Sequence, residues 1–435
     1  MLLDTLLAFS LLASTASQLR PTDANIGPGE AGLAIWLGLM LTRETLRLGP
    51  PLTAVLSRLL VFWIVFVVAL CLGTMTEYAL GAVHDPKWFW HDVFAYGVVA
   101  GVSCLIVVEP GAGTRMRRVA WLLATFGAGS LALQAAFGFG MISIGNIDPW
   151  EWDRLRGLSD NANQLALTCA LISLLSLHLA EAAARLFGKI IAIICMVIAI
   201  VVGRLTKSDA FLLALVAAVP TFVVLKIRTW LLSRGTRLTL RSALAGIFVL
   251  ILPFVLAYAI PLATSLASET HTTVMGMSRG GATGETEEAA RLRLEIWSEA
   301  INRGIHAGML GLGPGPHLPI PASIVAGRQT SANEPGHVEH PQVQFAPNFE
   351  AHNTFLDLFV QGGLIAVSAF VWLGAAALVT TWRARLDALT ALLVGAAIFS
   401  GFHLIVRHPI VWFSITFCLV MAAEARKPSA ASAGQ

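Results

Sequence analysis

The chain has 435 residues, of which 56% are hydrophobic and only 13% are charged. Soluble globular domains carry about 25% charged residues, so this composition excludes a cytosolic, nuclear or secreted enzyme. The net charge of +3 is too small to indicate a nucleic-acid-binding protein. All five cysteines lie inside apolar runs, which predicts neither a disulfide framework nor a thiolate metal site; they are Cys71, Cys104, Cys169, Cys195 and Cys418.

Apolar runs of membrane-spanning length recur along the whole chain, separated by short polar segments. We therefore predict an all-α integral membrane protein with about twelve transmembrane helices. The first run resembles a signal peptide, but it lacks a basic segment in front of it and is predicted to be a membrane helix. The predicted spans cover residues 2–18, 29–43, 59–79, 91–108, 118–138, 162–184, 187–203, 208–226, 241–262, 352–378, 387–406 and 409–424.

Basic residues gather in every second connection between the predicted spans, whereas most acidic residues lie in the other connections. Because cytoplasmic loops carry an excess of Lys and Arg, this asymmetry predicts the orientation of the chain. An even number of spans puts both termini on one side, and we expect that side to be the cytoplasm. The basic segments lie near residues 43–58, 115–118, 185–189, 226–241, 383–385 and 426–427.

One connection stands apart by its length. It divides the chain into spans one to nine (residues 1–262), a loop domain on the outer face (residues 263–351) and spans ten to twelve (residues 352–435). Loops of this length inside a compact architecture are usually functional. We expect a helix within the loop that Thr286 caps and Gly304 ends.

The expected loop helix has two different faces. Glu295, Glu299 and Arg303 follow one another at the i, i+4 spacing of ion pairs on a wet face. Arg293 and Trp297 share another face of the same helix, which makes this arginine a candidate for binding a ligand at the outer membrane surface.

His352 and Asn353 stand where the loop re-enters the membrane. A lone interfacial histidine is often structural, and that interpretation stays open. A position near the positive end of a helix favours the neutral imidazole, which can accept a proton. Gly362 and Gly363 follow in the same span and allow a neighbouring segment to approach closely.

Several cations are expected at the same depth as His352. They are Arg156, Arg204, Lys207 and Arg293. Each one alone is most simply a snorkelling or ion-paired side chain. Together they lie on the outer rim, where the positive-inside rule gives no reason for basic residues, so the cluster predicts a site for a phosphate-bearing lipid headgroup.

Three further polar groups belong to this face. Asp160 is expected to cap span six, and the nearby Asn163 is a candidate for contacting sugar hydroxyls. His403, Arg407 and His408 form a second polar group, either a structural hinge or a contact to an acceptor. Acidic residues are almost absent from the predicted spans, which argues against a proton-coupled transporter.

The histidines of the loop do not predict a metal site. They have no zinc-type spacing with thiol or carboxylate partners, so no metal is expected. Those considered as ligands are His306, His317, His337 and His340.

Three motifs together resemble the O-antigen ligase/polymerase superfamily. The family pattern has Arg-x-x-x-Trp, a Gly-x-Gly-x-Gly turn, and His-Asn followed by a later glycine. These elements fall here on Arg293 and Trp297, on Gly311, Gly313 and Gly315, and on His352, Asn353 and Gly363. An upstream Thr-x-Ser-Arg element of the family corresponds to Thr206-Lys-Ser-Asp209, where Asp replaces Arg, so Arg204 and Lys207 are expected to substitute.

The resemblance implies a glycosyltransferase of the GT-C-like, metal-independent kind without a cofactor. Its donor would be a glycan on undecaprenyl pyrophosphate and its acceptor a sugar hydroxyl of the lipid A core, joined with inversion in lipopolysaccharide biosynthesis. The large loop would then face the periplasm, and the chain would lie in the bacterial inner membrane with cytoplasmic termini.

The resemblance also implies the roles of the site residues. His352 would be the general base and Arg293 would stabilise the leaving group. The substrate-binding residues would be Arg204, Lys207, Arg156, Asn353, Asn163, Gly313 and Gly315. Two alternatives stay open at this point: a polysaccharide chain polymerase that uses the same donor class, and a transporter of lipid-linked glycans without catalysis.

Overall fold

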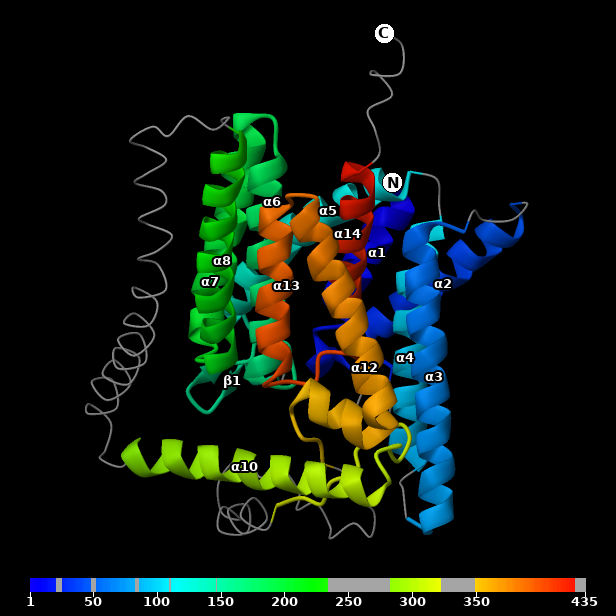
Figure 1. Cartoon of the computed structure of the whole chain (residues 1–435). Coiled ribbons are helices and arrows are strands. Elements are labelled where there is room, and N and C mark those ends of the chain that lie inside the picture. The colour runs from blue at the N-terminus through cyan, green and yellow to red at the C-terminus, as the bar shows by residue number, and fades with distance from the viewer. Residues whose placement is uncertain are drawn as a thin grey trace.

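The structure is a computed structural model, and it is a bundle of helices with one helix lying across an end (Figure 1). The predicted ninth span (241–262) and residues 322–348 of the loop lie outside the described residues. For residues 232–233 and 282–291 the backbone alone is described. The described residues are 1–20, 26–47, 52–82, 86–108, 111–145, 147–233, 282–321 and 349–426.

Each predicted span inside the described residues contains a helix. The helices are α1 (Leu2–Ala13), α2 (Pro28–Thr45), α3 (Ala54–Leu80), α4 (Pro86–Val108), α5 (Ala112–Gly138), α6 (Ala162–Ala182), α7 (Leu186–Leu205), α8 (Asp209–Ser233), α10 (Ala282–His306), α12 (Thr354–Arg383), α13 (Asp387–Ser400) and α14 (Pro409–Ala425). A short 3-10 helix, η1 (Ser17–Leu19), follows α1, and a small antiparallel hairpin pairs β1 (Trp150–Glu151) with β2 (Arg154–Leu155).

Seven of the described helices are long and apolar enough to cross a membrane: α3 to α8 and α12. This supports a multi-pass, all-α membrane protein. Three apolar helices are shorter, with 12, 14 and 17 residues in α1, α13 and α14. At about 1.5 Å per residue they cover less than a hydrocarbon core of about 30 Å. Their ends therefore bring irregular backbone, and polar side chains, into the depth of the bundle.

Several predicted boundaries are wrong. The span predicted to end at 406 ends at Ser400, because residues 401–408 form a loop. Helix α6 is capped by the Asn161 side chain, which accepts from Gln164 N at 2.9 Å, and not by Asp160.

Helix α10 begins at Ala282, upstream of the expected cap Thr286, and it continues past the expected end at Gly304. A Cβ on Gly304 would lie 2.2 Å from the ring of Phe359, so this glycine lets α10 approach α12 closely. The left-handed Gly308 follows the end of the helix (φ +61°).

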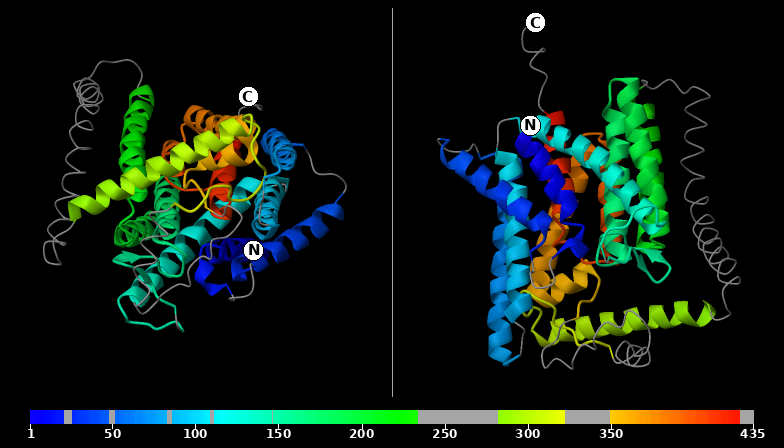
Figure 2. Two further views of the ribbon diagram at one scale, coloured as in Figure 1. Left: turned by 90° about the horizontal axis from the view of Figure 1, so that it is seen from below. Right: turned by 180° about the vertical axis from the view of Figure 1, so that it is seen from behind.

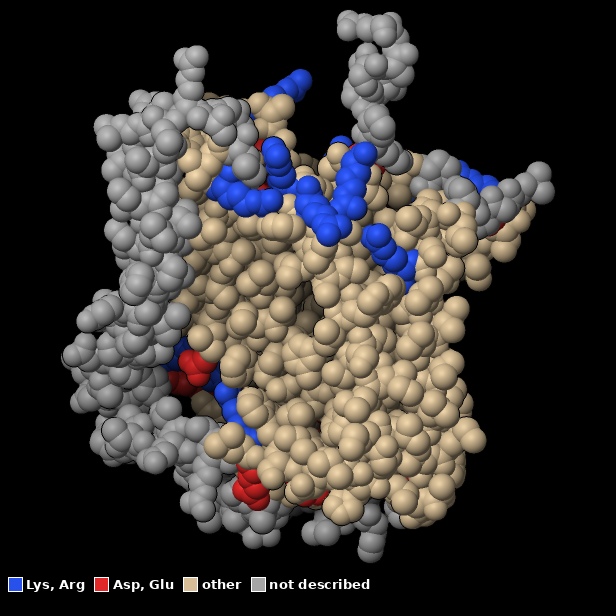
Figure 3. Space-filling model, viewed as in Figure 1, with Lys and Arg blue, Asp and Glu red and all other residues tan. Residues whose placement is uncertain are grey.

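Helix α1 begins and α14 ends at the same end of the bundle, which agrees with the prediction that both termini share one side (Figure 1). Lys and Arg side chains gather at this end in the space-filling view (Figure 3). Asp4 in α1 is buried there between Arg115 and Arg118 of α5, at 2.8 and 2.7 Å. Basic residues at this end thus hold helices together as well as setting the charge asymmetry.

Helix α10 lies across the opposite end, with its C-terminal part over α12 (Figures 1 and 2). A small apolar cluster, separate from the main core, joins the two helices. Ile296 and Ala300 of α10 pack there with Leu312 and with Val360 of α12. This cluster fixes α10 on the bundle, so the residues on its neighbouring faces have defined positions.

Helix α12 is broken at Gly362 and Gly363, where Gly363 has φ +63° and ψ −161°, a conformation open only to glycine. The break frees backbone groups, and the glycine turn at 311–315 satisfies them. Leu312 N donates to the carbonyl of Val360 and Gly313 N to that of Gln361, both at 2.7 Å. Non-helical backbone at membrane depth is stable only when such groups are satisfied.

The glycine turn lies against α3 at Gly73. A Cβ on Gly73 would lie 2.4 Å from the carbonyl oxygen of Gln361 and 2.5 Å from Gly313 N. Helix α3, the break in α12 and the glycine turn therefore meet with backbone against backbone.

We expect Gly73→Ala to destabilise the protein by about 1 to 3 kcal/mol, because the new methyl group has no room at this crossing. The measurement is the midpoint of thermal denaturation of the purified protein in detergent. Gly97→Ala in α4 is the matched control, since nothing lies within 4 Å of its Cβ position. Equal denaturation midpoints for the two variants would contradict the close backbone packing at Gly73.

Candidate functional site

His352 lies in a short segment, residues 349–353, that precedes α12 and is held from two sides. Its backbone is left-handed, with φ +51°, which costs about 1 to 2 kcal/mol for a residue other than glycine. Trp297 of α10 donates its indole N–H to the carbonyl of Ala351 at 3.2 Å. The Asp357 carboxylate accepts from Ala351 N at 2.7 Å and from Asn353 N at 3.1 Å.

Asn353 is the N-cap of α12. Its side-chain oxygen accepts from Phe355 N and Leu356 N at 3.0 and 3.3 Å. The predicted substrate-binding residue therefore also fixes the start of the helix that follows His352.

The His352 side chain is exposed and meets the ring of Phe349 edge to face at 5.4 Å. The protein packed around the ring lowers the pKa of His352, Glu350 raises it, and the positive charges of Arg293 and Arg407 lower it again. The net direction is downward, so the ring stays neutral to lower pH than usual. A neutral imidazole can accept a proton.

Arg407 joins the segment of His352 to two other parts of the chain. Its guanidinium pairs with Asp92 of α4 at 2.5 Å and with Glu350. Asp92 is fully buried, and His91 Nδ1 contacts the same carboxylate at 3.1 Å. Glu350 stands two residues before His352, so this charged group is connected to the segment of the candidate base.

A second chain of hydrogen bonds leads from Asp92 to the break in α12. The Gln361 amide donates to Asp92 at 3.3 Å, and Tyr96 O–H donates to the Gln361 side-chain oxygen at 2.6 Å. Gln361 is also the residue whose backbone carbonyl receives Gly313 N. The charged group and the broken helix are therefore one connected arrangement.

The loop 401–408 closes the site from a further side. Thr354 at the start of α12 donates to the carbonyl of His403 at 2.6 Å and accepts from Ile405 N at 3.0 Å. The rings of His403 and His408 stack with centroids 5.6 Å apart. Burial and neighbouring positive groups lower the pKa of both rings, and His352 is among the groups acting on His403.

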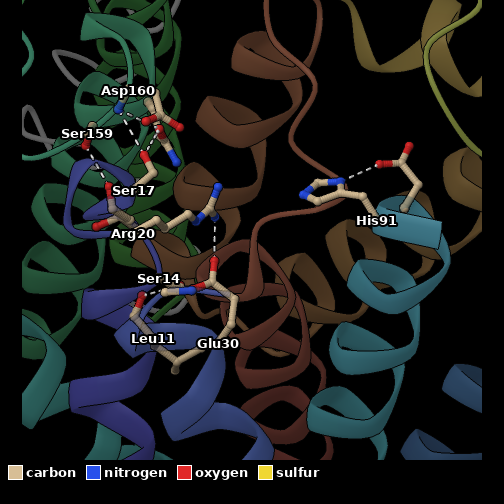
Figure 4. A network of polar contacts seen from close by, with 12 residues as sticks. Leu11, Ser14, Ser17, Arg20, Glu30, His91, Ser159 and Asp160 are labelled. Atoms are coloured by element: carbon tan, nitrogen blue, oxygen red, sulfur yellow. Dashed lines mark hydrogen bonds and ion pairs between the residues drawn. The ribbon is translucent and has the colours of Figure 1, made fainter. Parts of the chain in front are cut away.

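Arg20, which follows η1, forms an ion pair at 2.5 Å with Glu30 in the first turn of α2. Figure 4 shows this pair on one side and His91 on the other, with the His91 ring directed toward the arginine. Arg20 also lowers the pKa of His408. Polar side chains from five segments distant in sequence thus converge on the end of the bundle that α10 covers.

The other predicted cations occupy a different place, around the β1–β2 hairpin. Lys207 pairs with Asp153 at 2.5 Å and Arg156 with Asp148 at 4.0 Å. Asn163 accepts from Arg154 at 2.7 Å.

Arg204 is exposed in the last turn of α7. In the described part of the chain, α10, which carries Arg293, is bound to the segment of His352 through Trp297. Lys207, Arg156 and Asn163 are joined instead through the hairpin.

Gly313 and Gly315 are buried in the turn, with φ +88° and +117°. The amide of Gly313 is already bonded to Gln361 O, so this glycine fixes the turn on α12. A contact of either glycine with a pyrophosphate stays a prediction.

Sequence reasoning missed the acidic residues of the site. Asp92, Glu350 and Asp357 stand at the ends of predicted spans, where an acid reads as an ordinary helix-terminus residue. Arg407 was singled out, but without its carboxylate partners. An arginine between two membrane segments is costly unless it is paired. The position of Arg407 therefore predicts acidic neighbours, although it does not identify them.

The arrangement offers a neutral imidazole beside exposed and buried guanidinium groups. It can take up a proton and hold an anion in one place. Among the described residues, no three His, Cys, Asp or Glu side chains are grouped as ligands of a metal ion.

The fold and the site define a multi-pass helical membrane protein with histidines and cations at one end of the bundle. Residues 191–371 match a family model described as O-antigen ligase. This match confirms the resemblance that the motifs indicate. A comparison with curated proteins found no match.

The matched residues run from α7 into α12. They include Arg204, Lys207, Arg293 and the glycine turn, together with His352 and Asn353. Asp92 and Arg407, whose ion pair extends to Glu350 in the segment of His352, lie outside the match. The structure therefore adds these two residues to the surroundings of the family motifs.

We expect Arg407→Gln to destabilise the protein by about 3 to 5 kcal/mol, because it leaves the buried Asp92 without its cation. The measurement is thermal denaturation in detergent. Arg303→Gln is the control; it removes a partly exposed i, i+4 partner of Glu299 and should cost about 0.3 to 0.5 kcal/mol. A loss as small for Arg407→Gln as for the control would refute the pairing.

We expect the His352 ring to titrate below its ordinary value of 6.5, because the environment lowers its pKa. Carbon-13 NMR of histidine-labelled protein measures this titration, with His352→Asn used to assign the signal. Glu350→Gln should move the titration to still lower pH, since it removes the charge that raises the pKa. A midpoint above 6.5, or an upward movement in Glu350→Gln, would contradict the described surroundings of the ring.

Proposed function

We propose that the protein is an O-antigen ligase, which transfers a glycan from undecaprenyl pyrophosphate to a sugar hydroxyl of the lipid A core. The observation that carries this proposal is the bond from Trp297, one turn after Arg293 on α10, to the carbonyl of Ala351 next to His352, inside the matched family segment. The proposed site faces the periplasm of the bacterial inner membrane. The gathering of Lys and Arg at the other end supports this orientation, with cytoplasmic termini.

In the proposed reaction, the acceptor hydroxyl attacks the anomeric carbon of the donor and the pyrophosphate leaves with inversion. His352 accepts the proton of the hydroxyl as general base, a role that typically contributes about 10²- to 10⁴-fold to the rate. The lowered pKa of His352 supports this role, because the ring is neutral at pH 7. No metal or cofactor enters the proposed mechanism.

The leaving pyrophosphate gains negative charge that a cation must stabilise. Arg293 is exposed on α10 and acts electrostatically on His352, so it can meet a phosphate next to the reacting hydroxyl. Preorganised donors of this kind are worth about 2.7 to 4 kcal/mol each. Asn353, at the start of α12, would bind the donor beside it.

Lys207, Arg156 and Asn163 at the hairpin, together with Arg204 at the end of α7, are proposed to contact the glycan or the far phosphate. Lys207 and Arg156 hold the hairpin through Asp153 and Asp148, and both ion pairs are partly exposed. Exposed pairs contribute little to stability, so an anionic ligand can compete for these cations.

The test is a transfer assay with purified protein, undecaprenyl-pyrophosphate glycan and lipid A core in EDTA. We expect transfer by the wild type, a loss of about 10²- to 10⁴-fold in His352→Ala and of about 10²- to 10³-fold in Arg293→Ala. Arg303→Ala is the matched control: it removes an arginine of the same helix that pairs with Glu299, and it should retain activity.

Three results would argue against the proposal. Extension of the lipid-linked glycan without transfer to core would identify a polymerase. If the wild type performs neither reaction, a transporter without catalysis becomes the better interpretation. Equal losses in Arg303→Ala and Arg293→Ala would mean that the effect of Arg293 is not specific to the site.

A further inference from the structure

We infer that Asp357 is a positioning residue for His352, and this inference rests on the proposed function. Asp357 lies in the first turn of α12 and is buried, with 5% of its surface exposed. Its two carboxylate oxygens accept from two different backbone amides, Ala351 N and Asn353 N. These amides belong to the residues immediately before and after His352.

The two hydrogen bonds fix the backbone on both sides of a strained residue. His352 holds a left-handed conformation, which is unfavourable for a residue with a side chain. A carboxylate that bridges the flanking amides makes this conformation the one that satisfies both donors. Without the bridge, the segment can relax to the ordinary extended backbone, and the imidazole then points in another direction.

The other contacts of this segment do not replace the two bonds from Asp357. Trp297 fixes the carbonyl of Ala351, and Asn353 caps the helix through its own side chain. Neither contact involves the amides that Asp357 holds. The ring itself contacts Phe349 edge to face, an interaction that does not determine its direction toward an acceptor.

A different interpretation is that Asp357 merely strengthens the start of α12. An acid in the first turn of a helix is stabilising on its own, and the bond to Asn353 N resembles a capping interaction. The bond to Ala351 N goes beyond capping, because Ala351 lies outside the helix and before the histidine. The two interpretations differ in what they predict for the amide of Ala351 and for the turnover.

The first experiment measures amide hydrogen exchange in the full-length protein in detergent. Asp357→Asn keeps the size of the side chain but presents an N–H₂ group to one of the two amides. We expect the amides of Ala351 and Asn353 to exchange about tenfold faster. The control is Asp387→Asn, which removes a buried acid at the start of α13, near Lys226. Its effect on residues 351–353 should be absent.

The second experiment measures transfer with the same two variants. Asp357→Asn should lower kcat about tenfold and leave KM for the undecaprenyl-pyrophosphate donor unchanged, because it misorients the base without touching the donor. Asp387→Asn should leave both constants unchanged.

Each outcome decides the inference. Unchanged exchange at Ala351 and Asn353, an unchanged kcat, or a rise in KM equal to the fall in kcat would overturn the positioning role. Equal losses of kcat in the two variants would also overturn it. If the wild type transfers no glycan, the proposed function fails, and the exchange result still shows whether Asp357 holds the segment of His352.

Discussion

The structure depends on one break in a membrane helix and on the way its backbone groups are satisfied. At Gly362 and Gly363 the hydrogen bonds of α12 stop, and the carbonyls before the break accept from the turn at 311–313. An unsatisfied peptide group in hydrocarbon costs several kcal/mol, so turn and break must form together. The turn follows α10 directly, so this docking also brings Arg293 and Trp297 to the segment of His352.

The site is built on the same principle of satisfied polar groups at depth. The ends of the short helices leave polar side chains inside the bundle, and each charged one described there has a partner. Arg407 pairs with Asp92 and Glu350, and Arg20 pairs with Glu30. The Arg20–Glu30 pair is half-buried, whereas Asp92 is fully buried, so breaking the Arg407 pair leaves an uncompensated buried charge. The pair of Arg407 with Glu350 thereby helps to fix the segment that carries the exposed His352.

Two groups of cations face the same end of the bundle with different surroundings. Arg293 acts on the candidate base, whereas Lys207 and Arg156 are tied to the hairpin by exposed acids. A lipid-linked pyrophosphate glycan is long and carries charge at one end. A site with one cation near the candidate base and others farther away suits a substrate of that shape. This arrangement requires that Lys207 and Arg156 give up their aspartate partners and bind phosphate instead.

The sequence by itself determined the membrane class, the positions of the described spans and the family motifs, because hydropathy and turn residues are local properties. It placed His352 and Arg293 together through the motifs. Only the tertiary structure decided which acids meet Arg407, that α12 breaks at its glycines, and that the hairpin separates Lys207 from His352. These are pairings between residues far apart in the chain, such as Asp92 with Arg407, and no local pattern specifies them.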